Sequence, residues 1–132
     1  MKLLIASLLV LPLIAGIFSR WQKKVEPDEP DLDQQVLDQL KKAGSDLSKP
    51  HDIEFFLYFP TEVSANEAAK DVKAEVDNVT IQLSADKKHW LCFGTKKMIP
   101  NHDRLVALRK RFNEIAHTGA GVYDGWGTEV VK

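Results

Sequence analysis

The chain has 132 residues, 44% of them hydrophobic, which is enough for one small globular domain and no more. Its 18 Lys and Arg residues nearly balance its 19 Asp and Glu residues, and this balance argues against direct nucleic-acid binding, which favours strongly basic domains. The single cysteine, Cys92, cannot form an internal disulfide, so the sequence gives no positive sign of an oxidising compartment.

An uncharged apolar run covers residues 3–18, and a basic cluster follows it at residues 20–24. As a helix, the run would reach roughly 24 Å, somewhat short of the roughly 30 Å hydrocarbon core of a bilayer. The basic residues after the run favour a retained single-pass anchor in the inner membrane, with the domain in the cytoplasm. A cleaved signal peptide, leaving a secreted or periplasmic domain, fits the length equally well. Residues 1–24 are therefore predicted to be a membrane anchor or a signal segment.

Residues 25–31 differ sharply in composition, because they contain acidic residues and two prolines but no basic residue. The prolines block helix entry, so we interpret this stretch as a short spacer. The predicted domain covers residues 32–132 and starts with a helix over residues 32–43, whose apolar face should dock on the rest. Gly44 follows where a left-handed cap would end that helix.

Patterns in the middle of the chain predict alternating strands and helices. Residues 53–59 are almost continuously apolar, as in a central strand. Ser64 and Glu67 form a capping box, which predicts the start of a helix. The alternating residues 79–83 and the apolar residues 89–95 then predict a hairpin.

Asn101 is expected to cap a second long helix, which a glycine-containing segment, residues 119–121, ends. A last strand begins at Val122. The resulting order, β-α-β-β-α-β, predicts an α+β fold of the ferredoxin-like type, an antiparallel sheet with two helices. An extra docking helix and an N-terminal hydrophobic helix should precede this unit.

No constellation of residues indicates catalysis, a metal or a cofactor. The four histidines are scattered, and none has a second ligand at metal-binding spacing. Cys92 has apolar neighbours and is expected to be a small buried hydrophobe. Asp124, Glu129 and Glu54 are the carboxylates that might pair for acid-base chemistry, but spacing alone does not bring them together. We therefore predict that the chain is not an enzyme.

Aromatic residues on the predicted strands raise a separate possibility. Phe56, Tyr58 and Trp90 could imitate the sheet surface on which RNA-recognition domains stack bases. The near-neutral charge balance argues against that interpretation. We therefore expect no direct nucleic-acid partner.

The most distinctive segment is residues 122–128, VYDGWGT. Glycines flanking Trp126 are unusual inside a strand and suggest a bulge or a close backbone approach, with Gly125 and Gly127 letting the indole seat against the sheet. Because Tyr123 and Trp126 are three residues apart, a regular strand would turn them to opposite faces. Tyr123 and Asp124 are then the expected outward pair.

Tyr and Trp are enriched among interface hot spots. The candidate partner-binding residues are therefore Tyr123, Asp124, Trp126 and Glu129. The competing interpretation is that Trp126 simply fills the core.

The YDGWGT segment closely resembles a signature near the end of the regulator of ribonuclease activity B (RraB) family. The LKKAGSD segment, with its Gly44-Ser45-Asp46 turn, followed by Ile53 and Glu54, is similar to the helix end and turn before that family's first strand. Together the resemblance covers about residues 31–128. It implies an α/β sandwich and a protein that inhibits a ribonuclease E-type endoribonuclease by docking on it, without catalysis. An immunity-type or other protein-interaction module with a different partner is the alternative.

Overall fold

The computed structural model describes residues 30–132. The apolar run, residues 3–18, and with it the expected N-terminal hydrophobic helix, lies outside the described residues. Within residues 30–132, no helix combines the length and the apolar character needed to cross a bilayer. The elements in chain order are α2 (Leu32–Lys42), β1 (His51–Phe59), α3 (Glu62–Val72), β2 (Asn78–Leu83), β3 (Trp90–Met98), α4 (His102–Thr118) and β4 (Val122–Gly127).

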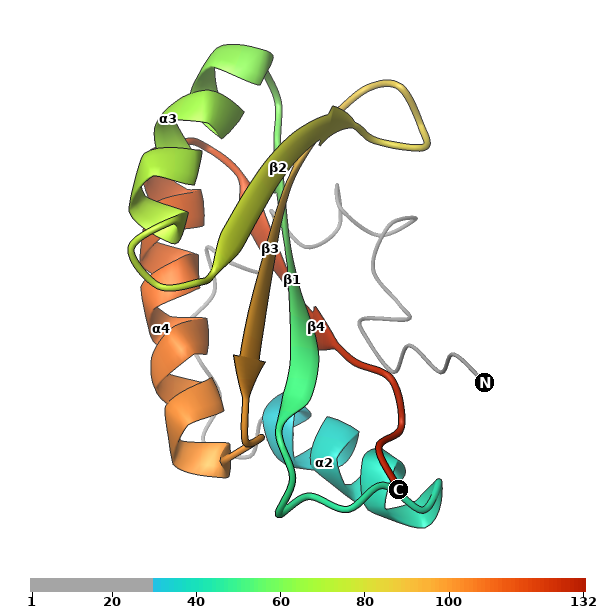
Figure 1. Ribbon diagram of the computed structural model, residues 1–132. Helices are drawn as coiled ribbons and strands as arrows, with labels where there is room; N and C mark the ends of the chain where they lie inside the picture. Colours follow the sequence, from blue (N-terminus) through green and yellow to red (C-terminus); the bar gives the residue numbers. More distant parts are fainter. Residues whose placement is uncertain (1–29) are drawn as a thin grey trace.

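The four strands form one antiparallel sheet in the order β2-β3-β1-β4. Helices α3 and α4 lie side by side on one face of this sheet, α3 over β2 and β3 and α4 over β1 and β4 (Figure 1). Helix α2 packs against α4. The predicted α+β class and element order are confirmed, and the strand order is compatible with a ferredoxin-like fold.

The main core fills the space between the sheet and the helices. Alternate residues of β1 point into it, and Ile53, Phe55, Leu57 and Phe59 are all fully buried. Cys92 of β3 is also fully buried, as expected of a small hydrophobe, and burial raises the pKa of its thiol to about 12. A thiol in this position is protonated at neutral pH and is a poor nucleophile.

Helix α3 begins earlier than the sequence pattern predicted. Its N-cap is Thr61, whose side-chain oxygen accepts the backbone N–H of Ser64 at 3.1 Å. Ser64 therefore lies inside the first turn, and the predicted capping box at Ser64 and Glu67 is wrong. The prediction for α4 is confirmed, because Asn101 caps it by accepting the backbone N–H of Arg104 at 3.1 Å.

Helix α2 ends in the manner that its glycine predicted. Gly44 has a φ of +92°, and the backbone N–H of Ser45 donates to the carbonyl of Leu40 at 3.0 Å. This is the bonding pattern of a Schellman cap, which requires a left-handed residue directly after the helix. Asp46 then closes the turn by accepting the backbone N–H of Ser48 at 3.0 Å. The Gly-Ser-Asp motif thus ends helix α2 and forms the turn that follows it.

Candidate functional site

A β-bulge in β4 sets the direction of its side chains. The register with β1 shifts between Phe56 and Leu57, and this shift leaves Asp124 as an extra residue on β4. Gly125 has a φ of +105°, a conformation that residues with a side chain rarely adopt. The bulge suggested by the sequence is confirmed, and the positive φ falls on Gly125 and not on Gly127.

The bulge turns Tyr123 and Trp126 toward the same face of the sheet. Both side chains join the main core, where Tyr123 is 4% exposed and Trp126 is 1% exposed. Asp124 is only 9% exposed. The expectation that Tyr123 and Asp124 form an outward pair is wrong, because the extra residue reverses the alternation of a regular strand. Of the four candidate partner-binding residues, Glu129 alone is exposed.

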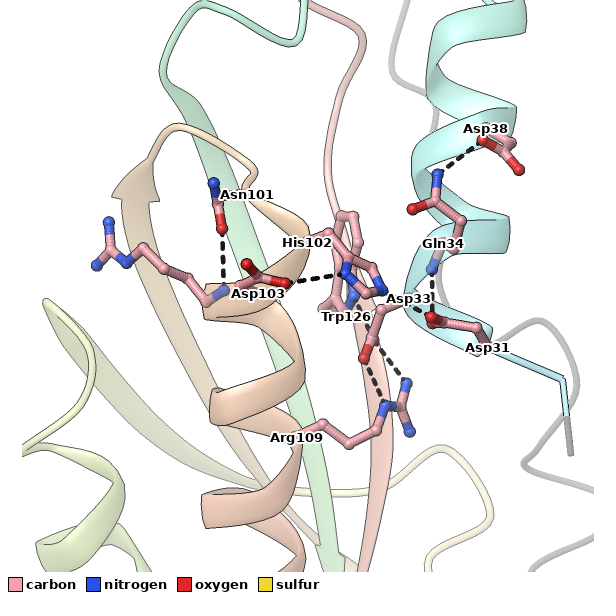
Figure 2. A network of polar contacts seen from close by, with 10 residues as sticks. Asp31, Asp33, Gln34, Asp38, Asn101, His102, Asp103, Arg109 and Trp126 are labelled. Carbon is pink, nitrogen blue, oxygen red and sulfur yellow. Dashed lines mark hydrogen bonds and ion pairs between the residues drawn. The ribbon is translucent and has the colours of Figure 1, made fainter. Parts of the chain in front are cut away.

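Trp126 is bound into a buried polar network, shown in Figure 2. Its indole Nε1–H donates to Asp33 Oδ1 at 3.0 Å. Arg109 donates from Nε to Asp33 Oδ2 and from Nη2 to Asp33 Oδ1, both at 2.9 Å. The same guanidinium carbon lies 5.3 Å from the centroid of the Tyr123 ring, within cation-π range. One carboxylate on α2 therefore joins α4 and β4.

Asp33 and Arg109 were not singled out from the sequence, although a signal for both is present. Asp33 shares a helical face with the buried residues Leu37 and Leu40. Arg109 lies four residues after Leu105 on the buried stripe of α4. Opposite charges within the apolar stripes of two helices indicate a buried ion pair, since a lone buried charge is costly.

A second polar contact holds the N-terminal end of α2. Asp31 caps the helix by accepting the backbone N–H of Gln34 at 3.0 Å, and its other oxygen lies 2.6 Å from His102 Nε2 on α4. The bond from Gln34 and then the one with His102 lower the pKa of Asp31. The same contact with Asp31 raises the pKa of His102.

The turn after α2 also holds the C-terminal segment, and the two lie close together in Figure 1. Ser45 Oγ lies 2.6 Å from Nε2 of the fully buried His51 and accepts the backbone N–H of Val131 at 3.0 Å. Thr128 Oγ1 donates to the carbonyl of Asp52 at 2.9 Å. The Gly-Ser-Asp turn and the end of the YDGWGT segment therefore make hydrogen bonds that hold the domain together.

The face of the sheet that points away from α3 and α4 offers more accessible aromatic surface. Phe56 of β1 pairs with Phe93 of β3, and their ring centroids lie 5.3 Å apart at 58°. Both rings are half-buried, and they pack on a small second cluster that contains Tyr58. We had expected Trp90 to share a sheet surface with Phe56 and Tyr58, but it packs against the main core.

Carboxylates lie close to this aromatic surface. Burial raises the pKa of Tyr58 to about 12, and the nearby charges of Asp124 and Asp86 add to the shift. Asp52 and Glu54 occupy the same face of β1 as Phe56, because successive even-numbered residues of the strand point to one side. The surface thus combines aromatic rings with negative charge.

The chain matches a known protein family. A sequence model described as "RraB: Regulator of ribonuclease activity B" matches residues 30–128, which is most of the chain and nearly all of its described part. No curated protein matches the chain significantly. The matched region begins just before α2 and ends at Thr128, after β4, so it includes both segments whose resemblance the sequence suggested. The chain belongs to the family of regulators of ribonuclease activity B.

Proposed function

We propose that this chain regulates a ribonuclease E-type endoribonuclease by docking on it, and that it acts by binding and not by catalysis. Family membership is the observation that carries the proposal, since the family is defined as regulators of ribonuclease activity. Trp126 and Ser45 serve packing and hydrogen bonds within the domain, so we expect a partner to contact other residues.

We also propose that residues 3–18 hold the domain at the cytoplasmic side of the inner membrane. The support is the pattern of an uncharged apolar run followed by basic residues, which biases orientation toward a cytoplasmic domain. Residues 25–31 would then separate the membrane from α2, which begins at Leu32. A tether of this kind would raise the local concentration of the regulator near any membrane-associated partner.

The regulatory role is tested by measuring cleavage of a fluorogenic RNA by a ribonuclease E-type enzyme from the same cell. The full-length chain, reconstituted in lipid nanodiscs, should slow cleavage in a dose-dependent manner. Empty nanodiscs and an unrelated endoribonuclease serve as controls. An unchanged rate at a large molar excess of the chain would contradict the proposal, and RNA cleavage by the chain alone would contradict the absence of catalysis.

The tether is tested separately by fractionating cells that produce the full-length chain. A retained anchor should leave the intact chain in the membrane fraction, resistant to alkaline carbonate and released by detergent. A chain lacking residues 1–24 should become soluble. If N-terminal sequencing instead finds a mature chain that has lost this segment, the signal-peptide alternative is correct.

A further inference from the structure

Strand β2 forms an open edge of the sheet. It bonds to β3 on one side only, because it stands first in the strand order β2-β3-β1-β4 (Figure 1). Its sequence, NVTIQL, contains no charged residue and no proline, and its pairing with β3 keeps one register from Asn78 to Leu83. Proteins usually protect an open edge with charges, prolines or bulges. Strand β2 has none of these within its length, so its edge is suited to pairing with another strand.

The register shows which backbone groups of β2 are free for such pairing. The N–H of Ser84 donates to the carbonyl of His89 at 2.8 Å, which continues the β2–β3 register. Hydrogen-bonded and non-hydrogen-bonded pairs alternate in an antiparallel ladder, so the even-numbered residues of β2 bond to β3. The N–H and C=O groups of Val79, Ile81 and Leu83 therefore point away from β3. No hydrogen bond outside the ladder engages them within residues 30–132.

The side chains of these three residues form an apolar row on the helix side of the sheet. Val79 and Ile81 pack against the main core, and Leu83 follows them in the alternation of the strand. Leu83 is nevertheless 45% exposed. Thr80 and Gln82 point to the other side of the sheet and are exposed. The edge thus has an apolar side and an uncharged polar side.

A second copy of the same edge matches both sides. When two β2 strands pair antiparallel about a two-fold axis at Ile81, Val79 of each copy bonds to Leu83 of the other. Each exposed Leu83 then lies beside an apolar Val79, and Thr80 lies opposite Gln82 on the polar side. This register pairs all three outward-facing residues, and a two-fold contact of this kind closes after two copies.

The charges at the two ends of β2 favour the same antiparallel arrangement. The turn before β2 has one basic and two acidic residues, Lys73, Glu75 and Asp77. The turn after it has one acidic and two basic residues, Asp86, Lys87 and Lys88. Asp86 bonds to His89 within its own turn, while both lysines are exposed. Antiparallel pairing places the acidic end of each copy beside the basic end of the other, whereas parallel pairing would bring like ends together.

We propose that the β2 edge binds a second copy of this chain, so that the two four-stranded sheets join into one continuous antiparallel sheet. The outward-facing N–H and C=O groups of Val79, Ile81 and Leu83 in both copies then have partners. A two-fold axis perpendicular to the sheet keeps α3 and α4 of both copies on the same face. The dimer is independent of the proposed function, because nuclease inhibition can be measured with or without it.

Cysteine cross-linking tests both the contact and its register. Cys92 is the only native cysteine and is fully buried, so an added surface cysteine can be followed by itself. In the proposed register, Thr80 and Gln82 of the second copy form a non-hydrogen-bonded pair with Cα atoms roughly 4.5 Å apart, which a disulfide can span. The two Thr80 residues are diagonal neighbours at roughly 7–8 Å, which is too far.

Two differently tagged full-length chains, Thr80→Cys and Gln82→Cys, are produced in the same cells and oxidised briefly. They should form at least about tenfold more mixed dimer than Thr80→Cys forms with itself. The matched control is Lys110→Cys, at an exposed position on α4, which lies over β1 and β4 and should not cross-link. The inference is overturned if no mixed dimer forms, if the control or Thr80→Cys alone cross-links equally, or if the cysteines link to a different protein instead.

A proline on the edge separates backbone pairing from side-chain contact. Leu83→Pro removes the outward N–H and leaves the β2–β3 ladder intact, whereas Leu83→Ala shortens the side chain and keeps the N–H. Added to both cysteine chains, Leu83→Pro should reduce the mixed dimer by about tenfold and Leu83→Ala by about threefold or less. Circular dichroism checks that both variants fold. Equal yields of mixed dimer from the two would overturn the inference.

Hydrogen exchange of the wild type needs no substitution and decides the case in which Leu83→Pro does not fold. In the concentrated full-length chain, the amides of Val79, Ile81 and Leu83 should exchange at rates within about tenfold of those of Thr80 and Gln82, which bond to β3. Exchange of the three outward amides at the rate of an unprotected amide would overturn the inference.

Discussion

The two sides of the sheet use polar residues in opposite ways. On the helix side, Asp33, Arg109 and Trp126 form a closed network in which each group satisfies another. On the open side, Asp52 is exposed, and the rings of Phe56 and Phe93 are half-buried outside the main core. The residues that stand out most in the sequence, those of the YDGWGT segment, are therefore not the residues that are accessible on the sheet. The aromatic residues of YDGWGT pack in the core, and the more accessible aromatic residues are Phe56 of β1 and Phe93 of β3.

The largest effect should come from breaking the helix-side network at Asp33. Replacing Asp33 with alanine leaves the Arg109 guanidinium and the Trp126 N–H without their acceptor. Because Arg109 keeps 26% of its side chain exposed, we expect a loss of about 3 kcal/mol in the free energy of unfolding, the low end for a broken buried pair. Urea denaturation measures it, with the exposed Asp38→Ala on the same helix as control. A loss no larger than that of the control would show that the network is not structural.

The next largest effect should come from the bulge. Gly125→Ala places a side chain at a φ of +105° and should cost about 2 kcal/mol in unfolding free energy. Gly127→Ala, on the same strand without a positive φ, should cost clearly less. Thermal and urea denaturation of both variants compare them. Equal costs would mean that packing and not backbone conformation requires glycine here.

A smaller effect of opposite sign is expected at Tyr123. Its hydroxyl is buried and has no hydrogen-bond partner within residues 30–132, so removing it relieves an unsatisfied group. Tyr123→Phe should therefore be neutral or stabilising by up to about 1 kcal/mol, and it should leave nuclease binding unchanged. If Tyr123→Phe loses nuclease binding while its fold stays intact, Tyr123 contacts the partner after all.

The smallest effect concerns the contact between Asp31 and His102, and it should depend on pH. The hydrogen bond with Asp31 raises the pKa of His102 above its ordinary value of 6.5. The protonated imidazole therefore stabilises the fold fully below pH 6.5, and this stabilisation is lost as pH rises through the raised pKa. The lowered pKa of Asp31 means that its stabilisation is present above 3.8 and is lost as pH falls. His102→Gln should lower the melting temperature most near pH 5. If the difference in melting temperature between the wild type and His102→Gln grows from pH 5 to pH 9, this assignment is contradicted.

Sequence patterns predicted the elements better than they predicted the site. The order of strands and helices and the caps at Gly44 and Asn101 follow from local rules and are confirmed. The cap of α3 was misassigned, because Thr61 and Ser64 are both suitable residues and only the backbone shows which one precedes the helix. Local patterns also could not show that Trp90 packs on the helix side of the sheet.

By itself, the sequence determined the fold class and the family, because glycine positions, apolar periodicity and the YDGWGT segment are local properties of the chain. Only the tertiary structure decided which residues are accessible. One extra residue at Asp124 shifts the register of β4, and this shift carries Tyr123 and Trp126 into the core together. Pairing across the sheet likewise brings Phe56 and Phe93 together from positions 37 residues apart, a contact that depends on strand register and not on either segment alone.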